Sequence, residues 1–130
     1  MKQITATINQ EQYKTTLQTA TNTIIADEPV EAGGHGLGFA PGELLASSLG
    51  ACTAITLKMY AERKGWHLEE AKVVVTFEWD KEALKSVMTR KITFIGNLDE
   101  AQKERLLVIA NSCPIHKVLS NPIEITTSLE

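Results

Sequence analysis

The sequence lacks the long apolar segments that would place a protein in or across a membrane. Its first sixteen residues are polar and alternating, without the apolar core of a signal peptide. No run of residues approaches the roughly 18 apolar positions that a membrane span needs. We therefore expect a cytoplasmic protein that does not associate with membranes.

The sequence also lacks an excess of basic residues and the common nucleotide-binding motifs. It has 13 Lys and Arg against 16 Asp and Glu, a net charge of -3, which excludes the basic surface expected of a nucleic-acid-binding protein. It contains no P-loop, no dinucleotide fingerprint and no convincing Ser-His-Asp spacing. We expect no bound cofactor, and a length of 130 residues predicts a single domain over residues 1–130.

Cysteine is scarce: the chain has only two, Cys52 and Cys113. Intracellular proteins seldom carry permanent structural disulfides. In the absence of a secretory signal, the pair is either two buried thiols or a redox couple. The count alone favours buried thiols, because free cysteine is among the most buried residue types.

The apolar pattern predicts an α+β fold with the order βββ-α-ββ-α-β. Period-two alternation and turn residues predict strands, and apolar residues every three or four positions predict helices. The predicted strands are 3–8, 13–19, 23–26, 73–79, 91–95 and 123–128, with a polar connection over 80–87. The predicted helices are 43–64 and 99–112, followed by a short helical turn over 115–119. Four glycines within residues 31–39 predict a mobile loop.

The first helix is long, rich in small residues and apolar on a wide face. About 22 residues give it a length of about 33 Å. The predicted apolar face contains Leu45, Leu49, Cys52, Ile55 (or Thr56) and Met59. A helix of this kind is typically buried on several sides.

Each cysteine lies on the apolar face of one of the two main helices. If the helices pack together, the two sulfurs could form a disulfide. Cys52 is almost three turns into its helix, so the helix dipole helps a thiolate there little, and a cation must come from elsewhere. Arg63 of the same chain is too far, about 16 Å along the helix axis.

Three other polar residues have simple interpretations. Glu43 is a first-turn helix charge, which suits the helix dipole. His35 in the glycine loop is either a ligand contact or, as the simpler interpretation, a solvated side chain. His116 follows Cys113 at a C-x-x-H spacing that could serve a metal, but no second paired motif accompanies it. We therefore expect no metal, and His116 is interpreted as a helix-end histidine that could modulate Cys113.

Two cysteine motifs carry a family resemblance. A proline-led helix containing Gly-Ala-Cys-Thr (50–53), followed by a strand pair and Asn-Ser-Cys-Pro-Ile-His (111–116), resembles the OsmC/Ohr family over nearly the whole chain. The segments 27–29, 31–34 and 60–66 are similar to the OsmC-like subgroup. The resemblance implies an OsmC-like fold of two antiparallel sheets. It also implies an intertwined homodimer with the long cysteine helices at its centre, whose large interface would bury what a monomer exposes.

The resemblance also implies an activity. Cys52 would be the peroxidatic thiol, whose thiolate attacks a peroxide O–O bond and becomes a sulfenic acid. Cys113 would be the resolving thiol, which condenses with it to a disulfide. A dithiol reductant would then restore both by exchange. The implied function is a thiol-dependent peroxidase that reduces organic or hydrogen peroxides.

The chain departs from the active members at two supporting positions. They carry an Arg near the second or third strand that stabilises the thiolate, whereas this chain has no Arg before Arg63, and Lys14 is the nearest basic residue. They also carry a Glu ten residues before the first cysteine, where this chain has Gly42 and then Glu43. We expect Lys14 or Arg63 of the partner chain to supply the cation. A non-enzymatic OsmC-like domain that binds a ligand or senses oxidation is the alternative, and inert packing of both thiols is a third hypothesis.

Overall fold

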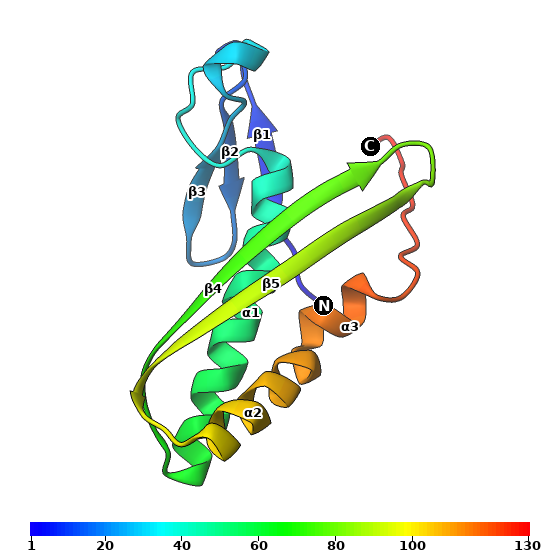
Figure 1. The fold of residues 1–130 in the computed structure, drawn as a ribbon. Helices are drawn as coiled ribbons and strands as arrows, with labels where there is room; N and C mark the ends of the chain where they lie inside the picture. The colour runs from blue at the N-terminus through cyan, green and yellow to red at the C-terminus, as the bar shows by residue number, and fades with distance from the viewer. The chain divides into compact units, whose positions relative to one another are not determined.

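The computed structural model describes all 130 residues, which form two compact units, Met1–Leu45 and Ala46–Glu130 (Figure 1). Each unit is described separately below. The single domain over residues 1–130 stays a prediction. The mixed α+β class with antiparallel sheets, predicted from the sequence, is confirmed.

The first unit is built on a three-stranded antiparallel meander. Strands β1 (Thr5–Ile8), β2 (Thr15–Gln18) and β3 (Thr23–Ala26) lie in the order β1-β2-β3. The predicted strands 3–8 and 13–19 are confirmed in shortened form, and 23–26 is confirmed as predicted. A short 3-10 turn, η1 (Val30–Ala32), follows the sheet.

The glycine segment after η1 is anchored by a buried carboxylate. Asp27 is 2% exposed and accepts hydrogen bonds from four backbone N–H groups, those of Tyr13, Glu28, His35 and Leu37, at 2.8–3.3 Å. A side chain on Gly34 or Gly38 would collide with neighbouring backbone, which explains why glycine is needed there. The prediction of a mobile loop therefore misses its main feature: Asp27 fixes the path of the segment.

Burial and hydrogen bonding act on Asp27 in opposite directions. Burial raises the pKa of its carboxyl, but the four N–H donors, those of Leu37, Glu28, His35 and Tyr13, favour the charged form and outweigh it. The pKa of Asp27 is therefore lowered from its ordinary value of 3.8. The segment is held in place by an anion at neutral pH.

The long helix α1 spans Pro41–Lys64, as predicted. Proline suits the first helical turn, since its missing N–H has no intrahelical partner there. The Glu43 carboxylate accepts a hydrogen bond from the Ala40 N–H at 2.8 Å and closes that turn. The helix ends at Gly65, whose φ of +70° suits glycine.

A long antiparallel hairpin of β4 (His67–Asp80) and β5 (Lys85–Asn97) follows α1. The predicted strands 73–79 and 91–95 lie inside it, but the predicted polar connection 80–87 is too long. The Asp80 carboxylate accepts from the N–H groups of Glu82 and Ala83 at 3.0 Å and closes a tight turn. The strand ladder therefore resumes at once, with Asp80 opposite Lys85.

The C-terminal part contains α2 (Glu100–Ile109), the 3-10 turn η2 (Ala110–Ser112) and α3 (Pro114–Leu119). Asp99 and Gln102 form the predicted capping box, with bonds of 2.8 and 3.0 Å. The predicted last strand, 123–128, is wrong. Residues 121–130 are exposed and have no ladder partner within the chain.

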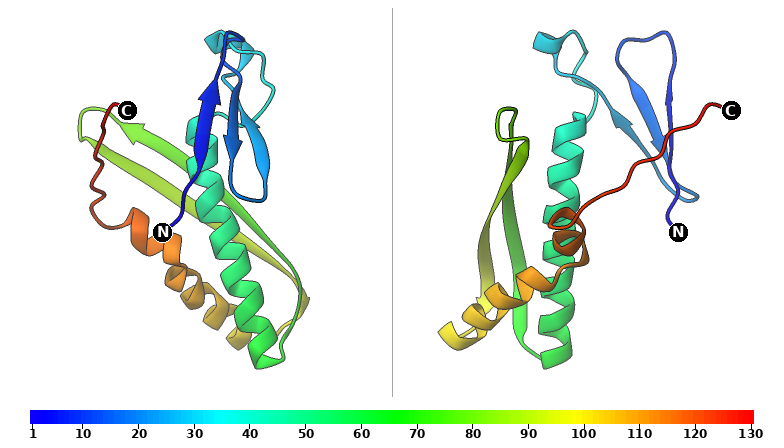
Figure 2. Two further views of the ribbon diagram at one scale, coloured as in Figure 1. Left: turned by 180° about the vertical axis from the view of Figure 1, so that it is seen from behind. Right: turned by 90° about the vertical axis from the view of Figure 1, so that its right-hand side faces the viewer.

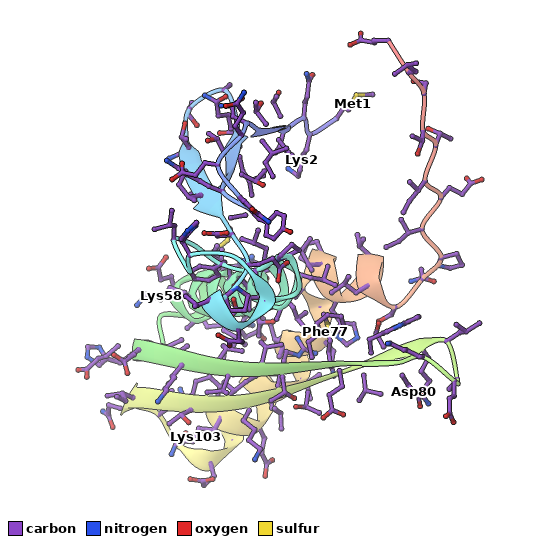
Figure 3. All side chains as sticks on the ribbon, turned by 90° about the horizontal axis from the view of Figure 1, so that it is seen from above. Met1, Lys2, Lys58, Phe77, Asp80 and Lys103 are labelled. Carbon is purple, nitrogen blue, oxygen red and sulfur yellow. The ribbon has the colours of Figure 1, made fainter.

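The core of the second unit lies where α1, the hairpin and α2 meet. It consists of Leu57, Ala61, Leu68, Leu106 and Ala110. Figure 2 shows α1 beside the hairpin, with α2 leading to α3 at the level of the middle of α1. In Figure 3, side chains fill the space between the hairpin and these helices, and Asp80 marks the hairpin turn.

The buried face of α1 is rotated from the predicted one. The residues buried on α1 are Leu49, Thr53, Leu57 and Ala61, four positions apart. Of the predicted face, Leu49 is buried and Cys52 half-buried, whereas Leu45, Ile55 and Met59 are 39%, 58% and 57% exposed. Both faces are apolar, so the sequence pattern did not indicate which one packs on the hairpin. A Cβ added to Gly50 would lie 3.4 Å from the Cγ2 atom of Val75, so this position of α1 faces β4.

By length and composition, α1 is apolar enough to cross a membrane, contrary to the prediction from the sequence. Its most apolar 18-residue window has a mean hydropathy of 1.3. The core helix of a water-soluble domain has the same properties, and α1 contributes Leu57 and Ala61 to the core of the second unit. The finding is therefore weak evidence for a membrane span.

Candidate active site

The structure brings Cys52 and Cys113 together within the second unit. Cys52 lies on α1 and is half-buried, and Cys113 lies between η2 and α3 and is fully buried. Both are free thiols, and they are within hydrogen-bonding reach of each other. We refer to Cys52 and Cys113 as the cysteine pair.

Cys113 is the better stabilised of the two as a thiolate. Burial raises the pKa of its thiol, but hydrogen bonds from the Cys52 thiol, the N–H groups of His116 and Ile115 and the Thr53 hydroxyl outweigh it. The distance from the His116 N to the Cys113 Sγ is 3.4 Å. The pKa of Cys113 is therefore lowered from 9.0.

The pKa of the Cys52 thiol is raised, in contrast to that of Cys113. Burial raises the pKa of its thiol first, and donation to Cys113 and repulsion from the Cys113 thiolate add to this. The Ile115 N–H and the Thr56 hydroxyl oppose the shift only in part. The hydrogen bonds around the pair therefore favour a negative charge on Cys113, whereas the more exposed thiol is that of Cys52.

Arg90 of β5 connects the segments that carry the two cysteines. Its Nη1 donates to the Thr53 hydroxyl at 3.0 Å and to the Ala110 carbonyl at 2.9 Å. Its Nη2 donates to the Asn111 side chain at 3.0 Å and pairs with the His116 Nδ1 at 2.7 Å. We refer to Arg90 and these four partners as the Arg90 cluster.

The sequence prediction missed Arg90 because it began the strand at Lys91, six residues after the start of β5 at Lys85. Met88, Arg90, Ile92 and Phe94 are half-buried, whereas the residues between them are exposed. The alternation of residue types from Met88 to Phe94 could have indicated that the strand includes Arg90. A single cation on the inward face of a strand needs acceptors in the interior.

Thr53, directly after Cys52, is also a residue that the prediction missed. It is fully buried, and its hydroxyl donates to the Leu49 carbonyl at 2.7 Å while accepting from Arg90. The same hydroxyl is placed to donate to Cys113. Since a hydroxyl has one hydrogen, the Leu49 carbonyl and the Cys113 sulfur compete for it.

His116 contacts the site through both its backbone and its ring. The backbone N–H donates to Cys113, and the ring Nδ1 lies against Arg90. A guanidinium has donors only, so Nδ1 accepts and the ring hydrogen is on Nε2.

The roles of Lys14, Glu43 and Arg63 at the cysteine pair stay predictions. Lys14 is in the first unit and pairs with Glu11 at 3.7 Å. Glu43 closes the first turn of α1, and Arg63 is exposed in the last turn. There a hydrogen bond from Arg105 lowers the pKa of Tyr60, and the charges of Lys64 and Arg63 add to it.

A small cavity of about 250 Å³ opens beside the Arg90 cluster, between β5 and α2. Its lining residues are Met88, Arg90, Ile92, Leu107, Ala110 and Asn111. No group of three or more His, Cys, Asp or Glu side chains is placed to hold a metal ion.

Residues 34–128 match the family model of OsmC-like proteins, which is most of the chain. No protein of curated function matches the sequence significantly. A Psychrobacter arcticus protein, named as an osmotic stress induced and detoxification response protein, has 26% identity and a TM-score of 0.77 over 91% of this chain and 88% of its own.

Two further solved structures share the fold. The OsmC-like protein of Mycoplasma pneumoniae has 22% identity and a TM-score of 0.78 over 92% of this chain and 87% of its own. The organic hydroperoxide resistance protein OhrB of Bacillus subtilis has 18% identity and a TM-score of 0.62 over 91% and 89%. The match over residues 34–128 shows that the chain belongs to the OsmC-like protein family.

Proposed function

We propose that the protein is a thiol-dependent peroxidase that reduces organic or hydrogen peroxides through the cysteine pair. The observation that carries the proposal is the contact between a half-buried thiol, Cys52, and a fully buried thiol whose charge is stabilised, Cys113. A related fold belongs to a protein named for organic hydroperoxide resistance. This name supports a role in the response to peroxides.

The accessible sulfur makes the first attack. The Cys113 thiolate takes the proton of the Cys52 thiol, and the Cys52 thiolate attacks the terminal, hydrogen-bearing oxygen of the peroxide. The O–O bond breaks and Cys52 becomes a sulfenic acid. The departing alkoxide takes the proton that Cys113 had accepted and becomes an alcohol, which returns Cys113 to its thiolate form. The two sulfur electrons reduce the peroxide.

Cys113 then resolves the sulfenic acid. Its thiolate attacks the Cys52 sulfur, the S–O bond breaks, and the hydroxide takes a proton to become water. A dithiol reductant restores both thiols by exchange through a mixed disulfide. One peroxide and one dithiol are consumed in each cycle.

A homodimer with the α1 helices at its centre is part of the proposal. Ile55 and Met59 on α1, and Ile123 and Ile125 near the C-terminus, are more than half exposed. A second copy would cover such residues, and its Lys14 or Arg63 could supply a cation to the cysteine pair. We also propose a cytoplasmic location.

Peroxide consumption in the presence of a dithiol tests the function directly. We expect Cys52→Ser to abolish it. Cys113→Ser should allow one oxidation of Cys52 without the intramolecular disulfide. Unchanged consumption by Cys52→Ser would contradict the proposal. Mass spectrometry after one equivalent of peroxide should show the loss of two hydrogens in the wild type only.

A redox-sensing domain without peroxidase turnover is the second candidate. The raised pKa of Cys52 favours it, because the accessible thiol is then mostly protonated and reacts slowly. Both candidates form the disulfide. They differ in rate, so a wild-type oxidation that takes many minutes at micromolar peroxide would favour the sensor.

A further inference from the structure

We propose that Arg90 is a positioning residue for the cysteine pair. Through Thr53 on one side and Ala110, Asn111 and His116 on the other, it holds the two sulfurs in reach of each other and orients the hydroxyl that stabilises the thiolate. The proposal rests on the proposed function for its catalytic meaning. Its geometry can be tested without peroxide.

The contacts of Arg90 are distributed in a way that fits this role. Thr53 follows Cys52 directly, Asn111 comes two residues before Cys113, and His116 comes three residues after it. Both terminal nitrogens of the guanidinium therefore have two partners, and these partners come from both cysteine segments. A planar fork fixes the direction of each bond, which a lysine ammonium cannot do.

Arg90 also affects whether the Thr53 hydroxyl donates to the Leu49 carbonyl or to the Cys113 sulfur. Donation from Nη1 to the Thr53 oxygen polarises the O–H bond, and hydrogen bonds in such chains strengthen one another. The polarised hydroxyl is a better donor to the Cys113 thiolate. Arg90 thus supports the charge on Cys113 through an intermediate hydroxyl.

The contacts of Arg90 give the site an arginine, although the chain has no Arg before Arg63 at the position where the active family members carry one. Arg90 brings a fixed positive charge to the segments around the cysteine pair from β5 of the same chain. A contribution from the partner chain is not needed for this part of the site. The prediction of Lys14 or Arg63 as the cation is the alternative. It would be favoured if the Arg90 variants described below kept the wild-type disulfide equilibrium and thiolate titration.

The first measurement is the equilibrium of the Cys52–Cys113 disulfide with reduced and oxidised glutathione. We expect Arg90→Met to lower the equilibrium constant for disulfide formation by at least about tenfold, because the thiols lose their alignment. Arg90→Lys should recover part of the loss. Lys91→Met, the exposed neighbour on β5, is the matched control and should leave the equilibrium unchanged.

The second measurement is the ultraviolet titration of the thiolates. Thr53→Val, which keeps the shape but removes the hydroxyl, should move the first titration to higher pH. Arg90→Lys should move it in the same direction, and the double variant should show less than the sum of the two shifts, since both act on one contact. Additive shifts would contradict the path through Thr53.

Outcomes of these two measurements separate positioning from general stabilisation. If Arg90→Met lowers thermal stability but, below its unfolding temperature, keeps the wild-type disulfide equilibrium and titration, the proposal is overturned. If Arg90→Met does not fold, Arg90→Lys and Thr53→Val decide in the same way. A wild type that forms the disulfide but consumes no peroxide refutes the peroxidase and leaves the role of Arg90 intact.

Discussion

The first unit and the second unit each contain a charged side chain with four hydrogen-bonding partners, and the partners differ in kind. Asp27 accepts hydrogen bonds from four backbone N–H groups, one before β2 and three in the segment after β3. Arg90 contacts three side chains and one carbonyl, all next to the cysteine pair. Backbone partners fix the path of a chain, whereas side-chain partners can change with the chemistry beside them.

The largest effect should come from the core beneath the Arg90 cluster. Leu57→Ala removes a fully buried side chain, and we expect a loss of about 2–5 kcal/mol in the free energy of unfolding. Urea denaturation measures it. Val74→Ala, on the exposed face of β4, should cost below about 1 kcal/mol. Equal losses for both variants would show that the second unit has no dominant core.

The next effect concerns the anion of the first unit. Asp27→Asn removes acceptor capacity from the loop, and amide hydrogen exchange at His35 and Leu37 should accelerate by about tenfold or more. The glutathione equilibrium of the cysteine pair should not change. A change in that equilibrium would show that the two regions are coupled.

The same carboxylate predicts a pH dependence. The pKa of Asp27 is lowered in the folded protein, so its contribution to stability is complete above the ordinary pKa of 3.8 and is lost as the pH falls through the folded value. Protection of the His35 amide should therefore be constant from neutral pH to about pH 5 and weaken below pH 3.8. Asp27→Asn should lack this acid step.

A smaller effect is expected on the titration of the cysteine pair. The thiolates should appear in two steps, one below and one above 9.0, which belong to the pair as a whole. Cys52→Ala removes a donor to Cys113, so the remaining step should lie at higher pH than the first wild-type step. A single step at an ordinary thiol pKa in the wild type would show that the sulfurs do not interact.

The smallest effect should come from one outer contact of Arg90. Asn111→Ala leaves the bonds to Thr53, Ala110 and His116 in place, and Asn111 is exposed. We expect the disulfide equilibrium to change by about threefold or less, since a single exposed hydrogen bond contributes little. A loss as large as that of Arg90→Met would show that Asn111 is the central residue of the cluster.

Local patterns predicted most elements of the fold. The helix 43–64, the capping box at Asp99 and the turn after Leu119 follow from spacing and cap residues, and the structure has all of them. The prediction of a last strand was wrong because the alternation in 123–128 does not show whether a partner strand exists, and a β-ladder needs one. The predicted connection 80–87 was too long because the Asp80 carboxylate closes a tight turn there.

The site was predicted in part. Apolar spacing placed the two cysteines on facing helices, and the structure brings them together. Arg90 and Thr53 act through contacts between residues 37 positions apart, which no local pattern contains. The pKa order of the two thiols could not be predicted either, because it depends on backbone N–H groups of α3 and on the burial of Cys113.

The hydrogen bond between the Thr53 hydroxyl and the Leu49 carbonyl makes the structure of α1 depend on the oxidation state of the cysteine pair. While Cys113 is a thiolate, its sulfur competes for that hydrogen with the Leu49 carbonyl. Once the sulfurs are joined, no anion remains to accept it, and the hydrogen belongs to Leu49 alone. One carbonyl of the long helix, three residues before Cys52, therefore gains a full hydrogen bond when the protein is oxidised and shares it again when the protein is reduced.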